Sequence, residues 1–172
     1  RGFLRVPVET EGGAALGVFA VLEDRRGRLW VGGRGGLVVL EPVSGRRSEV
    51  PLPEGTEVVT ALVEDHLGFL WLATDGQGIA RLDPETGTAQ WFRHDPLNPR
   101  SLSTDRVWSL YQDRFRVLWA GTYGGGVNRF DLAQKNFHQV RHDPGDPRSL
   151  SHDIVWCFWQ DRDGSLWVGT DS

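Results

Sequence analysis

Short apolar runs alternate with polar turns along most of the chain. Val59–Val63 (VTALV) and Val107–Tyr111 (VWSLY) are rich in β-branched and aromatic residues and too short for helices, so both are predicted to be strands. A polar turn such as Asp24–Gly27 (DRRG) follows a run of this kind and leads to a second run that contains Leu-Trp. A glycine-rich stretch then precedes a third run, such as Gly36–Glu41 (GLVVLE). The pattern predicts an all-β protein of antiparallel strands joined by tight turns.

This order of runs repeats four times. The Leu-Trp pairs supply the anchor, since their tryptophans, Trp30, Trp71, Trp119 and Trp167, are 41, 48 and 48 residues apart. Residues 94–123 and 142–171 are identical at 18 of 30 positions. Each full unit is expected to have a fourth strand, which is an aromatic stretch such as Ala89–Arg93 or Phe137–Arg141. Units of this length with four short strands are typical of β-propeller blades.

The repeat predicts one partial β-propeller over residues 1–172, with about 3.5–4 blades. The blade units are expected at about residues 16–57, 58–103, 104–151 and 152–172, the last of them incomplete. An isolated outer strand is expected within residues 1–10, at Phe3–Glu9, which brings the total to about fifteen strands. An open array exposes strand edges and an apolar blade face. We therefore expect the chain to form a homodimer or a larger self-associated species.

The composition of the chain limits the kinds of molecule that it is expected to bind. The chain has eight tryptophans and 22 glycines, and its net charge is −4. A mildly acidic chain without a block of basic residues does not favour nucleic-acid binding. The single cysteine, Cys157, excludes an internal disulfide and is expected to be a small buried apolar residue. No apolar run approaches the length of about 20 residues that spans a bilayer.

Two long segments carry a resemblance to a known family. They are RSLSTDRVWSLYQDRFRVLWAGTYGGGVNRF and RSLSHDIVWCFWQDRDGSLWVGT, and they resemble the two-component regulator propeller repeat. Two departures from that pattern stand out. Arg116 occupies the place of the turn glycine in the third unit, and Gly33-Arg34 stands where other units have Thr-Asp or Thr-Tyr.

The resemblance implies a sensory propeller in the periplasm, within a bacterial protein that is anchored in the inner membrane. The output would be a cytoplasmic histidine kinase or diguanylate cyclase outside this chain. The segment itself would have no catalytic activity. Two alternatives stay open, a propeller that serves as a protein-interaction scaffold and a propeller glycoside hydrolase or lyase.

Residues that repeat in every unit are expected to maintain the fold. The four tryptophans are predicted to pack between neighbouring blades. The acids Glu23, Glu64, Asp65 and Asp113 could in principle form a glycosidase pair, but their repetition favours one structural hydrogen bond in every blade. The histidine and cysteine spacings fit no metal site, so no metal, cofactor or catalytic residue is predicted.

Residues that differ between units, close to the start of each first strand, are candidates for ligand binding. They are Arg34, Asp75, Gln77, Arg106, Trp108, Tyr123, Trp156 and Asp171. Such a mixture of charged and aromatic side chains can bond hydroxyl groups and stack against flat ligands. The expected ligand is an unidentified small molecule or an oligosaccharide.

Overall fold

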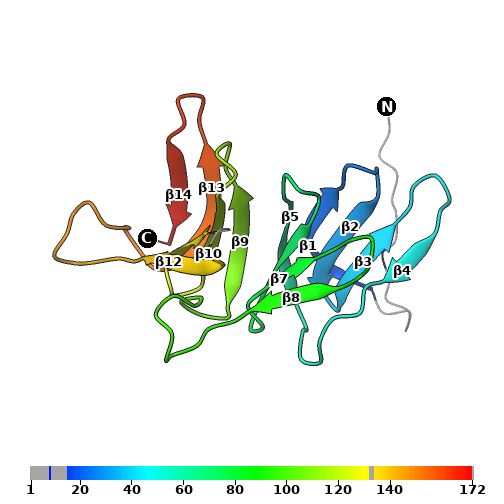
Figure 1. The fold of residues 1–172 in the computed structure, drawn as a ribbon, viewed down its shortest axis with the longest axis horizontal. Coiled ribbons are helices and arrows are strands. Elements are labelled where there is room, and N and C mark those ends of the chain that lie inside the picture. Colours follow the sequence, from blue (N-terminus) through cyan, green and yellow to red (C-terminus); the bar gives the residue numbers. More distant parts are fainter. Residues whose placement is uncertain (1–7, 9–14, 132–133, 172) are drawn as a thin grey trace.

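The computed structural model describes residues 8, 15–131 and 134–171, and their strands form a row of antiparallel sheets (Figure 1). The first sheet contains β1 (Gly17–Glu23), β2 (Leu29–Arg34), β3 (Gly36–Leu40) and β4 (Arg47–Glu49). The second contains β5 (Val59–Glu64), β6 (Leu70–Thr74), β7 (Ile79–Leu82) and β8 (Ala89–Phe92). The third contains β9 (Val107–Gln112), β10 (Leu118–Thr122), β11 (Val127–Asp131) and β12 (Asn136–Val140). A two-stranded sheet of β13 (Val155–Gln160) and β14 (Leu166–Thr170) completes the row.

The strand order confirms the prediction of an all-β, partial propeller with four-stranded blades. Each four-stranded sheet is a meander in which neighbours in sequence are neighbours in the sheet. The first strands β1, β5, β9 and β13 contact one another in succession, so they form the inner side of the row. The predicted strand Phe3–Glu9 lies outside the described residues, apart from Val8.

One aspartate organises the hairpin between the first two strands of each sheet. In the second sheet, Asp65 Oδ1 accepts the backbone N–H groups of Leu67 and Phe69 at 2.9 and 3.0 Å. Asp65 Oδ2 accepts the indole N–H of Trp71 at 3.0 Å. The same indole bond recurs at 2.8–2.9 Å in the pairs Trp30–Asp24, Trp119–Asp113 and Trp167–Asp161. In the second sheet the bond satisfies a buried donor and a buried carboxylate at once.

These hydrogen bonds also set the ionisation of the buried aspartates. Burial alone would raise the pKa of Asp65, but hydrogen bonds from Trp71, from two backbone N–H groups and from Arg81 outweigh burial, so the pKa lies below its ordinary value. The pKa of Asp24 is lowered in the same way. The stability gained from these carboxylates is therefore present above their ordinary pKa and is lost as the pH falls through the lowered value.

The tryptophans of the first two sheets pack against the sheet that follows. Trp30 shares a buried cluster with Val59 of the second sheet. Trp71 packs against Phe130 of the third sheet, with ring centroids 5.0 Å apart. The prediction that the repeated tryptophans pack between blades is confirmed for both.

The same prediction is wrong for Trp167, which is 62% exposed. Trp167 lies in β14, and no strand among the described residues covers its face. Cys157 in β13 is exposed for the same reason, although we expected it to be buried. The alanine at its place in the second sheet, Ala61, packs against the next blade.

A second repeated hydrogen bond joins each sheet to the next. In each case the donor is the backbone N–H of the residue that follows a hairpin aspartate. The acceptor is a Glu or Gln side chain in the next sheet, directly before the hairpin aspartate of that sheet. The three bonds are Arg25 to Glu64, His66 to Gln112 and Arg114 to Gln160, at 3.0–3.1 Å. The prediction of shared structural hydrogen bonds is therefore confirmed for Glu64, Asp65 and Asp113, whereas for Glu23 it stays a prediction.

The hairpin of the third sheet contains a conformational exception. Gly27, Gly68 and Gly164 occupy equivalent turn positions with φ between 77° and 104°. Arg116 holds the same position with φ 68°. A side chain in this left-handed region is disfavoured because its Cβ approaches the backbone. The missing turn glycine therefore leaves the fold intact but strains this turn.

We predict that Asp65→Ala lowers the free energy of unfolding by about 3 kcal/mol, because it leaves a buried indole N–H and two backbone N–H groups without their acceptor. Asp161→Ala is the matched control, since solvent can replace the partner of the exposed Trp167. Urea denaturation of both variants measures the difference. Equal losses for the two variants would contradict the role of burial.

We also predict that Arg116→Gly raises the free energy of unfolding by about 0.5–1 kcal/mol, because relief of the left-handed strain exceeds the entropy cost of a glycine. Gly68→Ala at the equivalent turn should be destabilising. Thermal and urea unfolding of the two variants provide the measurement. A destabilised Arg116→Gly variant would show that the arginine side chain contributes more than its backbone costs.

Candidate functional site

Each first strand carries a β-bulge at the same place. The register shifts by one residue opposite the second strand in all four sheets. The residues displaced from the ladder are Phe19, Thr60, Trp108 and Trp156. A bulge bends its strand and redirects the extra side chain. Because the first strands form the inner side of the row, these bulges set the residues that face one another across it.

Three of the bulged residues and one loop residue form an aromatic patch, defined here as Phe19, Trp108, Tyr123 and Trp156. Trp108 lies at its centre, with ring centroids 6.2 Å from Phe19, 5.5 Å from Trp156 and 6.3 Å from Tyr123. Tyr123 and Trp156 meet edge to face at 6.0 Å. Phe19, Tyr123 and Trp156 are 39–48% exposed, so the patch presents flat aromatic surface to solvent.

A charged pair adjoins this patch. Arg106 Nε donates to Asp75 Oδ1 at 2.8 Å, and the guanidinium lies 4.3 Å from the ring centroid of Tyr123. The hydrogen bond to Asp75 raises the pKa of Arg106 above its ordinary value. Isolated β-bridges fix this arrangement, because Asp75 pairs with Arg106 and Tyr123 pairs with Ile154 across adjacent sheets. The site therefore draws on loops and strands of all four sheets.

The structure brings five of the eight candidate ligand-binding residues together. These are Asp75, Arg106, Trp108, Tyr123 and Trp156. Of the other three, Arg34 ends β2 and Gln77 and Asp171 lie outside the strands, and none of the contacts in the described residues joins them to the patch. Arg34 bridges to Val58, Gln77 N–H donates to Thr74, and Asp171 N–H donates to Ile154.

Sequence reasoning missed Phe19, although a signal for it was present. Phe19 stands five residues before the hairpin aspartate Asp24, as Trp108 stands five residues before Asp113. Alignment of the units on that aspartate places Phe19 in the same bulge. Its contact with Trp108 is not a local feature, because it joins the first sheet to the third.

The indole nitrogen of Trp108 is buried and has no hydrogen-bond partner among the described residues. Aromatic rings surround it in edge-to-face geometry, at interplanar angles of 88° for Phe19 and 83° for Trp156. Trp108 therefore supports the exposed rings around it, and those rings supply the accessible surface of the patch.

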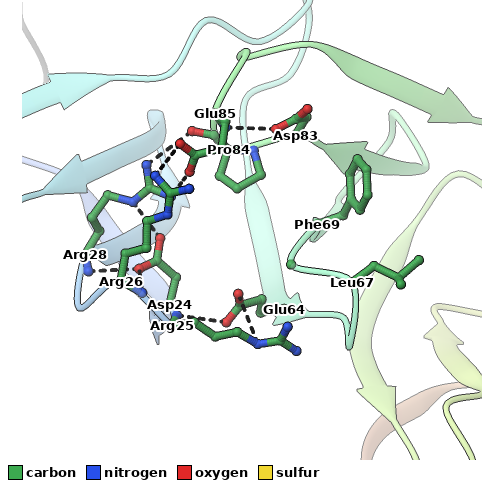
Figure 2. A pocket seen from close by; sticks show the side chains of 11 residues that line it. Asp24, Arg25, Arg26, Arg28, Glu64, Leu67, Phe69, Asp83, Pro84 and Glu85 are labelled. Carbon is green, nitrogen blue, oxygen red and sulfur yellow. Dashed lines mark hydrogen bonds and ion pairs between the residues drawn. The ribbon is translucent and has the colours of Figure 1, made fainter.

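A pocket of about 370 Å³ lies at the opposite ends of the first two sheets (Figure 2). Arg28 donates to Asp24 at 2.7 Å and to Glu85 at 3.0 Å, and Arg26 also pairs with Glu85 (Figure 2). Arg25 donates to the backbone oxygen of Asp65 at 2.7 Å. All three arginines form hydrogen bonds or ion pairs with other groups of the protein. We therefore interpret this pocket as a structural interface between the first two blades.

The repeated His-Asp-Pro loops are also satisfied internally. His94 Nδ1 lies 2.7 Å from the backbone oxygen of Leu102, and Ser101 Oγ accepts the N–H of Asp95 at 2.9 Å. The loop that begins at His142 repeats these contacts. Within the described residues no cluster of three potential metal ligands occurs, and no helix could span a membrane.

Comparison with known proteins supports this architecture. The model of a family described as two component regulator propeller matches residues 12–35, 53–76, 101–124 and 149–172, more than half of the chain. No curated protein matches the sequence.

Solved structures show the same fold. One, described as the extracellular domain of the hybrid two component system BT4673 from B. thetaiotaomicron, matches with a TM-score of 0.74 and 24% identity, over 89% of this chain and 20% of that one. The extracellular domain of the hybrid two component system BT3049 from the same organism matches with a TM-score of 0.76 and 21% identity, over 90% of this chain and 22% of that one. Virginiamycin B lyase from Staphylococcus aureus matches with a TM-score of 0.69 and 16% identity, over 90% of this chain and 49% of that one. The chain thus spans about a fifth of the first two proteins.

Proposed function

Because the chain belongs to the two-component regulator propeller family, we propose that it is a sensory, ligand-binding part of a propeller outside the bacterial cytoplasm. The whole protein would be anchored in the inner membrane, with this part in the periplasm. It would signal to a histidine kinase or another output domain in the cytoplasm. The similarity in fold to the extracellular domains of BT4673 and BT3049 supports this location.

The aromatic patch carries the proposal. Three of its members, Phe19, Trp108 and Trp156, stand at the bulge of different blades, and Thr60 occupies the same position in the second sheet, so the residue type at this position varies. Positions that maintain the fold repeat, whereas these vary. Exposed aromatic surface beside a charged pair suits a ligand with a flat apolar face and polar edges.

The repeated acids support a role in binding without catalysis. Asp24, Asp65, Asp113 and Asp161 are all engaged by a hairpin and an indole. An aspartate that is held in this way in every blade has a structural role. The similarity to virginiamycin B lyase is one of fold and brings no catalytic residue to this chain.

A ligand on the patch would act on the relative positions of the sheets. The exposed rings of Phe19, Tyr123 and Trp156 come from the first, third and fourth sheets, so a ligand that touches all of them would favour one spacing between blades. A ligand shifts an equilibrium only by its difference in affinity for the two states. The favoured spacing would then pass through the rest of the sensor to its output domain.

We predict that Trp156→Ala weakens ligand binding by about tenfold, or 1.4 kcal/mol, because it removes an exposed ring from the patch. The probe is a panel of neutral oligosaccharides, titrated against the chain and followed by tryptophan fluorescence and calorimetry. Trp159→Ala is the matched control, since Trp159 lies on the same strand and is 60% exposed outside the patch. Equal affinities of the two variants for a bound oligosaccharide would contradict the proposal.

We further propose that the 172-residue chain self-associates in solution. Trp159 and Trp167 pair across β13 and β14 and are 60% and 62% exposed. Apolar surface of this kind favours association.

Light scattering after size-exclusion chromatography should show a dimer or a larger species, and Trp159→Asp should shift it toward monomer because a charge on this face opposes burial. Phe115→Asp, which places a charge on a 67% exposed turn residue elsewhere, is the control. A monomeric unaltered chain at high concentration would refute the proposal.

A further inference from the structure

The Asp75–Arg106 pair uses only part of its hydrogen-bonding capacity. Arg106 Nε donates to Asp75 Oδ1. Within the described residues, no hydrogen bond engages Asp75 Oδ2 or the two terminal nitrogens of Arg106. The two side chains remain 26% and 46% exposed. A carboxylate oxygen accepts hydrogen bonds and guanidinium N–H groups donate them, so the pair offers an acceptor next to donors.

Both side chains are held in place before any ligand arrives. The β-bridge between Asp75 and Arg106 fixes their backbones, and the ring of Tyr123 supports the guanidinium from one side. Groups that are already ordered lose less conformational entropy on binding. The ring of Tyr123 also contacts the ring of Trp156, so the apolar surface of the patch lies directly beside the charged pair.

The charge of this pair selects against charged ligands. Asp75 and Arg106 compensate each other at 2.8 Å, so the pair carries no net charge. An anionic ligand that approached Arg106 would meet the carboxylate of Asp75, and a cationic ligand would meet the guanidinium. Neutral hydroxyl groups can satisfy both partners, because each hydroxyl both donates and accepts.

We propose that the Asp75–Arg106 pair binds two neighbouring hydroxyl groups of a neutral saccharide whose ring lies on Tyr123 and Trp156. One hydroxyl donates to Asp75 Oδ2, and the other accepts from a terminal nitrogen of Arg106. The apolar face of the sugar ring covers the exposed aromatic rings. This inference rests on the ligand-binding function proposed above and names the chemistry of the ligand.

The test compares pairs of oligosaccharides of equal length that differ only in a carboxylate at C6. Glucose, galactose and mannose tetramers are each set against their uronic acid counterparts, and each is titrated against the 172-residue chain by calorimetry. At least one neutral tetramer should bind, and about tenfold more tightly than its acidic counterpart.

Two variants separate the contributions of the pair. Asp75→Asn leaves the charge of Arg106 uncompensated, so it should weaken the neutral tetramer and strengthen its acidic counterpart. Arg106→Gln should weaken the neutral tetramer by about tenfold with no gain for the acid. Asp146→Asn is the matched control, since Asp146 also pairs with an arginine, Arg148, at 3.2 Å but is not one of the candidate ligand-binding residues. It should leave both affinities unchanged, and thermal unfolding checks that each variant is folded.

The outcomes distinguish this inference from the function on which it rests. If an acidic tetramer binds the unaltered chain as tightly as its neutral counterpart, or if Asp75→Asn leaves their ratio of affinities unchanged, the inference is overturned while the patch remains a binding site. If no tetramer of either kind binds, the inference is overturned.

Discussion

The hydrogen bond between an indole N–H and a hairpin aspartate is the contact on which each blade depends. The tryptophan supplies the apolar area that holds neighbouring blades together, but its N–H must find an acceptor when it is buried. Asp65 provides that acceptor and also closes the turn that brings Trp71 opposite the first strand. The bond persists in the fourth sheet, where Trp167 is 62% exposed, so the hairpin forms it without help from the neighbouring blade. The indole bond of a hairpin therefore does not require the packing of a neighbouring blade.

This arrangement divides each first strand into two parts. The end next to the hairpin aspartate repeats, because Glu64, Gln112 and Gln160 each accept a backbone N–H from the preceding blade. The other end carries the bulge, whose side chain leaves the ladder. At this position Thr60 is buried and donates its hydroxyl to the backbone oxygen of Val107 in the next sheet at 2.6 Å, whereas Trp156 is 43% exposed. Thr60 and Trp156 can therefore occupy the same structural position. The blade tolerates variation where the chain faces the inner side of the row, and the candidate site lies there.

The sequence was sufficient to predict the elements and the blade architecture, because turn chemistry and strand periodicity act over few residues. The hairpin aspartates, the strands and the aberrant turn at Arg116 were all visible in the repeat. Burial depends on which surfaces meet, and Trp167 and Cys157 show that a repeated position need not have a repeated environment. The candidate site was predictable in part. Residues close to the bridges between adjacent sheets were recognised. Alignment of the units could have identified the position of Phe19, but its contact with Trp108, which joins the first sheet to the third, could be found only from the structure.

The rigidity of the blades makes the patch suited to sensing. Within a sheet, the ladders, the hairpin aspartate and the indole bond hold the strands in one arrangement, so a ligand cannot easily deform a single blade. The patch spans several sheets, and Arg106 joins the carboxylate of one loop to the aromatic ring of another. A ligand bound there would therefore change the angle or the spacing between blades, because the strands within each blade are held in one arrangement. Under the proposed function, a whole blade would then move as a rigid body, and a small change at the patch would become a larger displacement at its outer strands. Interblade packing between apolar faces permits such adjustment more readily than the directional hydrogen bonds within each sheet.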